Sequence, residues 1–126
     1  MVDSAETRKL IVLDDEPLIV RSLVRRMKAE GYRQYEISGF TNQGEAIAEL
    51  AKGDCFAFIT DLKMPVVSGD KVIEYIQKMY PEQKCIVITG FAEREKIQRI
   101  AKAGNTVAIL TKPLDFERLI DTLEAM

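Results

Sequence analysis

The amino-acid sequence predicts an α/β protein with a parallel sheet covered by helices on both faces. Five short apolar runs alternate with five segments whose apolar residues recur at helical spacing, which is the pattern of successive βαβ units. Several of the runs are continuously apolar, as expected of strands that are buried on both faces. Right-handed crossovers between parallel strands would distribute the helices over both sides of the sheet. The predicted strands are residues 9–13, 35–38, 55–60, 84–89 and 106–110.

Each predicted helix follows its strand and carries start or stop signals. Proline suits a first helical turn, asparagine and aspartate cap helix N-termini, and glycine commonly follows a helix end. The five helices are expected from Pro17 to before Gly31, from a Thr41-Asn42 cap to before Gly53, from about Gly69 to Met79, from about Ala92 to Ala103, and from an Asp115 cap onward.

Length and composition predict a single domain, residues 1–126 with a core at about 9–124, because a chain of 126 residues builds one well-developed core. No separate output domain is expected after the fifth helix. The formal net charge of −2 gives no reason to expect direct binding to nucleic acid or to an anionic membrane. The apolar runs are only strand-sized and the first residues are polar, so we expect a cytoplasmic protein without a membrane span or secretion signal.

The cysteines and the missing histidines exclude some chemistry. Cys55 and Cys85 are not in a CxxC motif, and no histidine is present to complete a zinc site. Each cysteine lies at the start of a predicted strand, where a reduced thiol behaves as a small apolar residue. Since the chain has no imidazole of its own, any phosphohistidine in its reaction must come from a partner.

Polar residues follow four of the apolar runs, at the point where each strand is expected to end. Asp14-Asp15 follows the first run, Asp61 the third, Thr89 the fourth and Lys112 the fifth. In open parallel sheets, ligands bind outside the carboxyl ends of the strands, so these side chains are expected to converge there. The site should therefore lie at this edge of the sheet.

The residue types at this edge favour phosphoryl transfer assisted by a divalent cation. Clustered carboxylates repel one another unless a cation lies between them, and an oxygen-only ligand set favours magnesium. With Mg²⁺ and Lys112 on either side, Asp61 could act as a nucleophile toward a phosphoryl group. Thr89 could then donate a hydrogen bond to a phosphoryl oxygen.

These motifs, in this order, resemble those of response-regulator receiver domains of two-component signalling. The resemblance extends from about Lys9 to Leu123 and implies a flavodoxin-like, doubly wound (βα)5 sandwich whose five-stranded parallel sheet has the order 2-1-3-4-5. The motifs that carry it are Asp14-Asp15-Glu16-Pro17, Asp61-Leu62-Lys63-Met64-Pro65 with Ser68-Gly69, Thr89-Gly90 and Lys112-Pro113.

The resemblance implies a phosphoacceptor and a set of metal ligands. Asp61 corresponds to the aspartate that accepts the phosphoryl group from a sensor histidine kinase or a histidine phosphotransfer protein. Asp15, Asp61 and the backbone carbonyl of Lys63 correspond to direct Mg²⁺ ligands, while Asp14 acts through water or directly. Such domains signal by a conformational change and hydrolyse their own aspartyl phosphate slowly.

The resemblance also implies how phosphorylation is sensed. Lys112 corresponds to the lysine that pairs with the phosphoryl group, and Thr89 to the hydroxyl that moves toward it. The Lys112–Pro113 peptide bond is expected to be cis, as it usually is in the family. The family default for self-association is a homodimer through the face of the fourth helix, fifth strand and fifth helix.

One position departs from the family pattern. Receivers commonly carry Tyr or Phe three residues before the conserved lysine, where this chain has Ile109. Isoleucine can change rotamer, but it buries no ring and offers no hydroxyl, so the sequence supports phosphate capture better than the usual aromatic relay. Phe91 is a weak candidate to replace that ring. Leu18, on the outward side of the first helix, is either a singly exposed leucine or part of a kinase-docking patch.

Three other functions remain as alternatives. A magnesium-dependent aspartyl phosphatase would normally place its nucleophile and acid in an Asp-x-Asp motif and carry a substrate-covering cap, whereas this chain has adjacent aspartates. A flavodoxin-like nucleotide module needs a Gly-rich or hydroxyl-rich phosphate loop after the first strand. A receiver that acts only as a phosphorylation-independent interaction module is kept open by Ile109.

Overall fold

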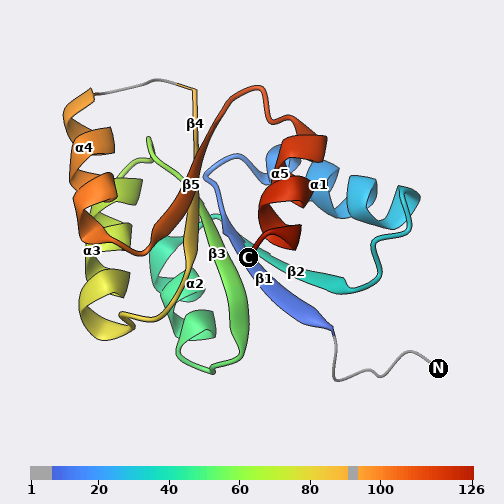
Figure 1. Ribbon diagram of the computed structural model, residues 1–126, viewed down its shortest axis with the longest axis horizontal. Helices are drawn as coiled ribbons and strands as arrows, with labels where there is room; N and C mark the ends of the chain where they lie inside the picture. The colour runs from blue at the N-terminus through green and yellow to red at the C-terminus, as the bar shows by residue number, and fades with distance from the viewer. Residues whose placement is uncertain (1–6, 91–93) are drawn as a thin grey trace.

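The computed structural model describes residues 7–90 and 94–126, which form one parallel sheet flanked by helices (Figure 1). The strand order is β2-β1-β3-β4-β5, and all neighbouring pairs are parallel, so the predicted order is confirmed. The strands are β1 (Arg8–Leu13), β2 (Tyr35–Phe40), β3 (Cys55–Asp61), β4 (Cys85–Thr89) and β5 (Thr106–Thr111). The helices are α1 (Pro17–Ala29), α2 (Gln43–Leu50), α3 (Gly69–Met79), α4 (Arg94–Ala103) and α5 (Phe116–Glu124).

The strands extend slightly further toward the site than the apolar runs suggest. β2 continues to Phe40, because its last two residues still pair with the end of β1. β3 and β5 include Asp61 and Thr111, so the polar ends of both runs belong to the sheet. The predicted start of the fourth helix at Ala92 lies outside the described residues.

The two faces of the sheet bury two separate apolar clusters. α1 and α5 cover one face, while α2, α3 and α4 cover the other (Figure 1). The central strands contribute alternately to both clusters, as Leu10 and Val12 face α1 and α5 whereas Ile11 and Leu13 face the opposite helices. Burial on both faces explains the continuous apolar runs of the sequence.

Two predicted helix caps are confirmed. The side chain of Asn42 accepts a hydrogen bond from the backbone N–H of Glu45, at 3.0 Å, at the start of α2. The side chain of Asp115 accepts from Glu117 and Arg118 at the start of α5. Each cap supplies an acceptor for N–H groups that the helix itself leaves unpaired.

The cysteines are reduced, as predicted. Cys85 is fully buried at the start of β4, and Cys55 is half-buried at the start of β3. Burial in apolar surroundings raises the pKa of the Cys85 thiol to about 12 and that of Cys55 to about 11. Both thiols are therefore protonated at neutral pH and act as small apolar residues.

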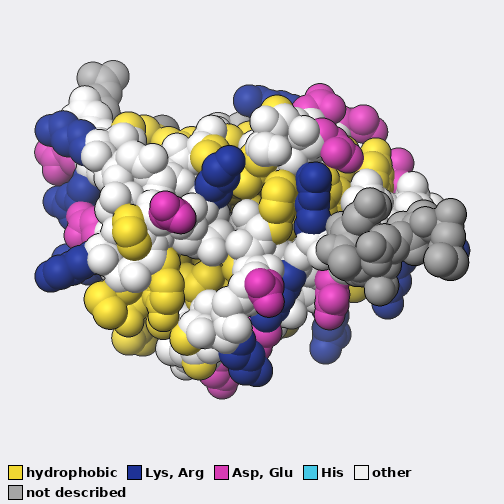
Figure 2. Space-filling view, turned by 60° about the horizontal axis from the view of Figure 1, so that its bottom comes forward, with side chains coloured by type: hydrophobic (Ala, Val, Ile, Leu, Met, Phe, Trp, Pro, Cys, Tyr) yellow, Lys and Arg dark blue, Asp and Glu magenta, His cyan; other side chains and the backbone are white. Residues whose placement is uncertain are grey.

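The surface carries both signs of charge. On the face shown in Figure 2, Lys and Arg side chains are interspersed with Asp and Glu, outside the grey atoms. This distribution agrees with the net charge of −2 and offers no broad basic surface on that face. No helix in the described part of the chain has the length and hydropathy needed to cross a membrane.

Candidate functional site

The first acidic residues of the site follow β1, and they differ in burial. The backbone N–H of Asp14 donates to the carbonyl of Phe40 at the end of β2, at 3.0 Å. Asp14 is only 3% exposed, and its Oδ1 accepts the N–H of Glu16 at 2.9 Å. Asp15 is exposed. The two adjacent carboxylates therefore reach the same edge from different depths.

Asp61 is the last residue of β3, where it pairs with Ile88 of β4 and is 6% exposed. The chain returns closely past it at the start of α3. The N–H of Gly69 donates to the carbonyl of Leu62 at 2.7 Å, and a Cβ at Gly69 would lie 2.1 Å from the carbonyl oxygen of Asp61. Only glycine permits this approach, so Gly69 helps to fix the backbone of Asp61.

Lys112 enters the site from the other side, directly after β5. Its backbone N–H donates to the carbonyl of Thr89 at 2.9 Å, which extends the pairing of β4 and β5. Its Nζ lies 3.1 Å from Oδ2 of Asp61 and 3.4 Å from Oδ2 of Asp14. The Lys112–Pro113 peptide bond is cis, as predicted.

Burial and charge act in opposite directions on these groups. Burial tends to lower the pKa of Lys112, but the hydrogen bond with Asp61 and the charge of Asp14 outweigh it, so the pKa is raised. Lys112 is therefore a stable cation at neutral pH. Burial raises the pKa of Asp14, and the Glu16 N–H and Lys112 offset this only in part.

The acidic residues fit a divalent cation. Three carboxylate oxygens lie within 4.8 Å of one another, one each from Asp14, Asp15 and Asp61. Lys112 forms ion pairs with Asp14 and Asp61, and the three clustered carboxylates repel one another unless a cation lies between them. The oxygen-only donor set suits a hard divalent cation such as Mg²⁺.

The remaining predicted site residues lie around the same edge. Thr89 is 2% exposed at the end of β4. Lys63 is exposed and lines an open cavity of about 460 Å³ together with Asp15, Asp61 and Lys112. Phe91 lies outside the described residues.

Ile109 does not belong to this edge. It is half-buried in β5 and packs against the apolar cluster beneath α4, to which Ile97 also contributes. The structure thus keeps an aliphatic contact between β5 and the α4 side of the sheet.

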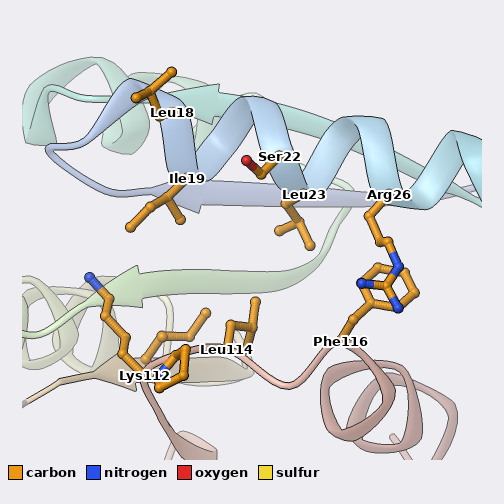
Figure 3. A pocket seen from close by; sticks show the side chains of 10 residues that line it. Leu18, Ile19, Ser22, Leu23, Arg26, Lys112, Leu114 and Phe116 are labelled. Atoms are coloured by element: carbon orange, nitrogen blue, oxygen red, sulfur yellow. The ribbon is translucent and has the colours of Figure 1, made fainter.

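An apolar groove borders the site on its α1 side (Figure 3). It is lined by Leu18, Ile19 and Leu23 of α1 and by Pro113 and Leu114 after β5. At its far end, the guanidinium of Arg26 lies over the ring of Phe116, 4.8 Å from the centroid. Lys112 lines both this groove and the acidic cavity. Leu18 is 70% exposed, which confirms its outward orientation.

Sequence reasoning missed two features near the site. One is Arg99 of α4, whose side chain is 50% exposed and pairs with Asp70 and Glu74 of α3. Asp70 itself is 1% exposed and also accepts from Ser68. The second missed feature is Gln43, whose side chain reaches the loop after β3. Both contacts join segments that are distant in sequence, so local patterns gave no signal.

Comparison with known proteins agrees with this geometry. A family model described as the response regulator receiver domain matches residues 10–124. The chain belongs to this family. Receiver domains are phosphoacceptor signalling domains that interact with sensor kinases or phosphotransfer proteins. Among solved structures, this receiver domain resembles chemotaxis response regulator CheY4 of Vibrio cholerae, with a TM-score of 0.79 and 25% identity over 94% of this chain and 98% of that one.

Curated relatives are longer than this chain. The transcriptional regulatory protein PdtaR of Mycobacterium tuberculosis is 32% identical over 123 residues, which cover 97% of this receiver domain and 58% of PdtaR. The sensor kinase CckA of Brucella abortus is 25% identical over 98% of this chain but only 13% of its own length. This receiver domain thus matches only part of each relative.

Proposed function

We propose that this receiver domain accepts a phosphoryl group on Asp61 in a His-Asp phosphorelay, in a Mg²⁺-dependent transfer from a partner's phosphohistidine. The observation that carries the proposal is the position of Asp61, whose carboxylate belongs to the acidic cluster and also lies 3.1 Å from Lys112 Nζ. A cation on each side of a carboxylate favours its reaction with an anionic phosphoryl group, because charge on the transferred oxygens is neutralised.

In the proposed transfer, a carboxylate oxygen of Asp61 attacks phosphorus. A new O–P bond forms while the P–N bond to the partner's imidazole breaks, and that nitrogen takes up a proton from solvent. Lys112 pairs with a phosphoryl oxygen and Thr89 donates its hydroxyl proton to another. Mg²⁺, when bound, supplies charge neutralisation on the phosphoryl oxygens.

The proposed metal ligands are Asp15, Asp61 and the backbone carbonyl of Lys63, with Asp14 acting through water or directly. All three carboxylates belong to the cluster described above. Lys63 lies two residues after Asp61 and lines the same cavity. Asp14 is more buried than Asp15, which suits a role nearer the sheet.

The proposed phosphodonor is a sensor histidine kinase or a histidine phosphotransfer protein. The chain contains no histidine, so the phosphohistidine has to be brought to Asp61 by another molecule. We assign the groove beside α1 to a helix of that partner, with Leu18 as an apolar contact. Continuity supports this assignment, because Lys112 lines both the groove and the acidic cavity. Neither nucleic acid nor membrane is a proposed direct partner, and the proposed location is the cytoplasm.

Thr89 and Ile109 are the proposed switch residues. Thr89 ends β4 close to the site, while Ile109 contacts the α4 side of β5. Without an aromatic ring at position 109, the change transmitted to α4 would be smaller than in receivers that carry one. Slow self-dephosphorylation and a homodimer through the α4, β5 and α5 face follow the family default. We propose no further enzymatic activity.

Phosphorylation in solution tests the proposal directly. Incubation with acetyl phosphate and Mg²⁺ should add one phosphoryl group to the wild-type protein, as measured by intact mass. Asp61→Ala should remove this labelling, and EDTA should suppress it. Asp121→Ala, at an exposed position on α5, is the matched control and should be labelled as wild type. Labelling that survives Asp61→Ala would contradict the assignment of the phosphoacceptor.

The same preparation separates the alternative functions. Sustained turnover of small phosphate esters would instead favour the aspartyl phosphatase. A flavin retained through purification would favour a nucleotide module. Wild-type protein that never becomes labelled but binds a partner would favour a phosphorylation-independent interaction module.

A further inference from the structure

The loop between β3 and α3 contains an unusual turn at Val66. Its φ is +70°, a left-handed conformation that is rare for a β-branched residue. The N–H of Val67 donates to the carbonyl of Pro65 at 2.9 Å, so Val66 is the centre of a three-residue turn, and a turn of this kind with positive φ is strained. The Val66 side chain is 97% exposed and so gains little from packing. Something other than Val66 must stabilise this conformation.

The side chain of Gln43 supplies contacts on both sides of the turn. Its Nε2 donates to the carbonyl of Pro65 at 2.9 Å and to the carbonyl of Val67 at 2.8 Å. A primary amide carries two N–H groups, so one nitrogen can bond both carbonyls at once. Gln43 is the first residue of α2, directly after the Asn42 cap, and is therefore held by a rigid element.

The loop is also fixed at its base. Leu62 and Met64 are buried, and the N–H of Gly69 closes the loop onto the carbonyl of Leu62. Lys63 lies between these two buried side chains, so its backbone carbonyl can move only if the loop moves. Within the turn, Val67 packs against the apolar cluster beneath α2, α3 and α4, whereas Pro65 and Val66 are exposed, and Gln43 bonds the carbonyls of Pro65 and Val67.

We infer that Gln43 is a positioning residue for the metal site, which acts by clamping the turn at Val66 and thereby fixing the backbone carbonyl of Lys63. This inference rests on the proposed function, in which that carbonyl is a Mg²⁺ ligand. Residues that orient metal ligands without touching the metal commonly change metal affinity by about 10-fold to 100-fold when they are replaced. Gln43 would thus set Mg²⁺ affinity from a helix that contributes no ligand.

Calorimetric titration with MgCl2 alone tests the clamp. Gln43→Met retains the length of the side chain and removes both N–H groups, and it should weaken Mg²⁺ binding by about tenfold. Gln83→Met is the matched control, because Gln83 also donates its amide to a backbone carbonyl, that of Lys84, away from the site. This control should bind Mg²⁺ as the wild type does.

A second substitution tests the mechanism. Val66→Gly removes the strain of the positive φ, since glycine adopts it freely, and loses little packing. In the double variant Gln43→Met/Val66→Gly, the turn should persist without the clamp, and Mg²⁺ affinity should return to within about threefold of wild type. A purely structural role would lower the thermal midpoint in EDTA but leave the Mg²⁺ affinity of the folded protein unchanged.

The outcomes separate the clamp from the proposed function. If the wild type binds Mg²⁺ and Gln43→Met binds it with equal affinity, the clamp is overturned and the phosphoacceptor assignment still stands. Absence of Mg²⁺ binding by the wild type would overturn both. Failure of Gln43→Met to fold, if Val66→Gly did not reverse it, would show that Gln43 supports the whole domain and would overturn a role confined to this loop.

Discussion

β3 and β5 each bring one of the proposed reactive groups, Asp61 and Lys112, to the site, but they hold it differently. β3 is paired on both sides, with β1 and β4, and its last five residues, from Ala57 to Asp61, are all buried. β5 is an edge strand paired with β4 alone in the described sheet, and only Leu110 of its six residues is buried. Asp61 therefore ends a strand in the middle of the sheet, whereas Lys112 follows a strand at its edge.

This difference suits the two groups to different tasks. A nucleophile must keep its attack geometry within a narrow range, because small displacements reduce the rate of reaction steeply. A cation acts through a charge interaction that changes gradually with distance. A long lysine side chain after an edge strand can follow a phosphoryl group, while Asp61 keeps its place. The comparison predicts that substitutions in β3 destabilise the fold more than substitutions in β5, and that the end of β5 can move more easily than the end of β3.

The largest expected effect comes from the core of β3. Phe58→Ala should lower the free energy of unfolding by about 3–5 kcal/mol, because Phe58 is fully buried and its removal leaves a cavity. Urea denaturation followed by circular dichroism measures the change. Val107→Ala is the comparison on β5, where the side chain is 44% exposed, and it should change stability by about 0.5 kcal/mol or less. Similar losses at both positions would contradict the contrast between the strands.

Gly69→Ala should have the next largest effect. The added methyl group would lie 2.1 Å from the backbone oxygen of Asp61, which cannot move without displacing β3. We expect a loss of about 3 kcal/mol, at the upper end of the usual range for overpacking, and slower labelling by acetyl phosphate. Gly44→Ala in α2 would bring its methyl group 3.2 Å from Asn42 Oδ1, the oxygen that caps the helix, and a small shift of that side chain should offset the gain in helix propensity, so we expect little change in stability.

Ile109→Ala should cost about 1–2 kcal/mol, because Ile109 is half-buried and loses only part of its contacts with the α4 side of the sheet. Phosphorylation of Asp61 should proceed at a rate near that of wild type. A strong loss of phosphorylation in a folded Ile109→Ala protein would mean that β5 positions the site as rigidly as β3 does.

Asp14→Asn should have the smallest effect, and one of opposite sign. Burial raises the pKa of Asp14 above its ordinary value of 3.8, so ionised Asp14 opposes folding. That penalty is present above the folded-state pKa and disappears as the pH falls below 3.8. In EDTA, Asp14→Asn should therefore be more stable than wild type at pH 7, by a margin that shrinks on acidification. Asp15→Asn, at an exposed position, is the matched control.

The sequence predicted the sheet and the location of the site because both depend on local patterns. The run 55–60 followed by Asp61 is visible in the chain, and strands in a parallel sheet end at a common edge. The pairing register then extended β3 and β5 by one residue each, which hydrophobicity alone does not indicate. The different burial of Asp14 and Asp15 was also not predictable, since it depends on how the chain turns after β1.

Contacts between distant polar residues were the main omission. Asp70 and Arg99 are separated by 29 positions, and Gln43 and Val67 by 24. A charged residue on a helix is usually solvated, so its partner on another helix becomes evident only when the helices are packed. The positive φ of Val66 could not be predicted from the sequence either, because valine rarely adopts this conformation.

Lys112 lines both the acidic cavity and the apolar groove, so the two sites are adjacent. This adjacency suggests two ways to inhibit the domain. Compounds aimed at an aspartate and Mg²⁺ need charge, and the chemistry they address is common to many phosphoryl-transfer proteins. A neutral apolar compound seated against Leu18 and Leu114 would instead compete with the partner helix that we propose for this groove. Its selectivity would follow the side chains of α1 rather than the residues that react.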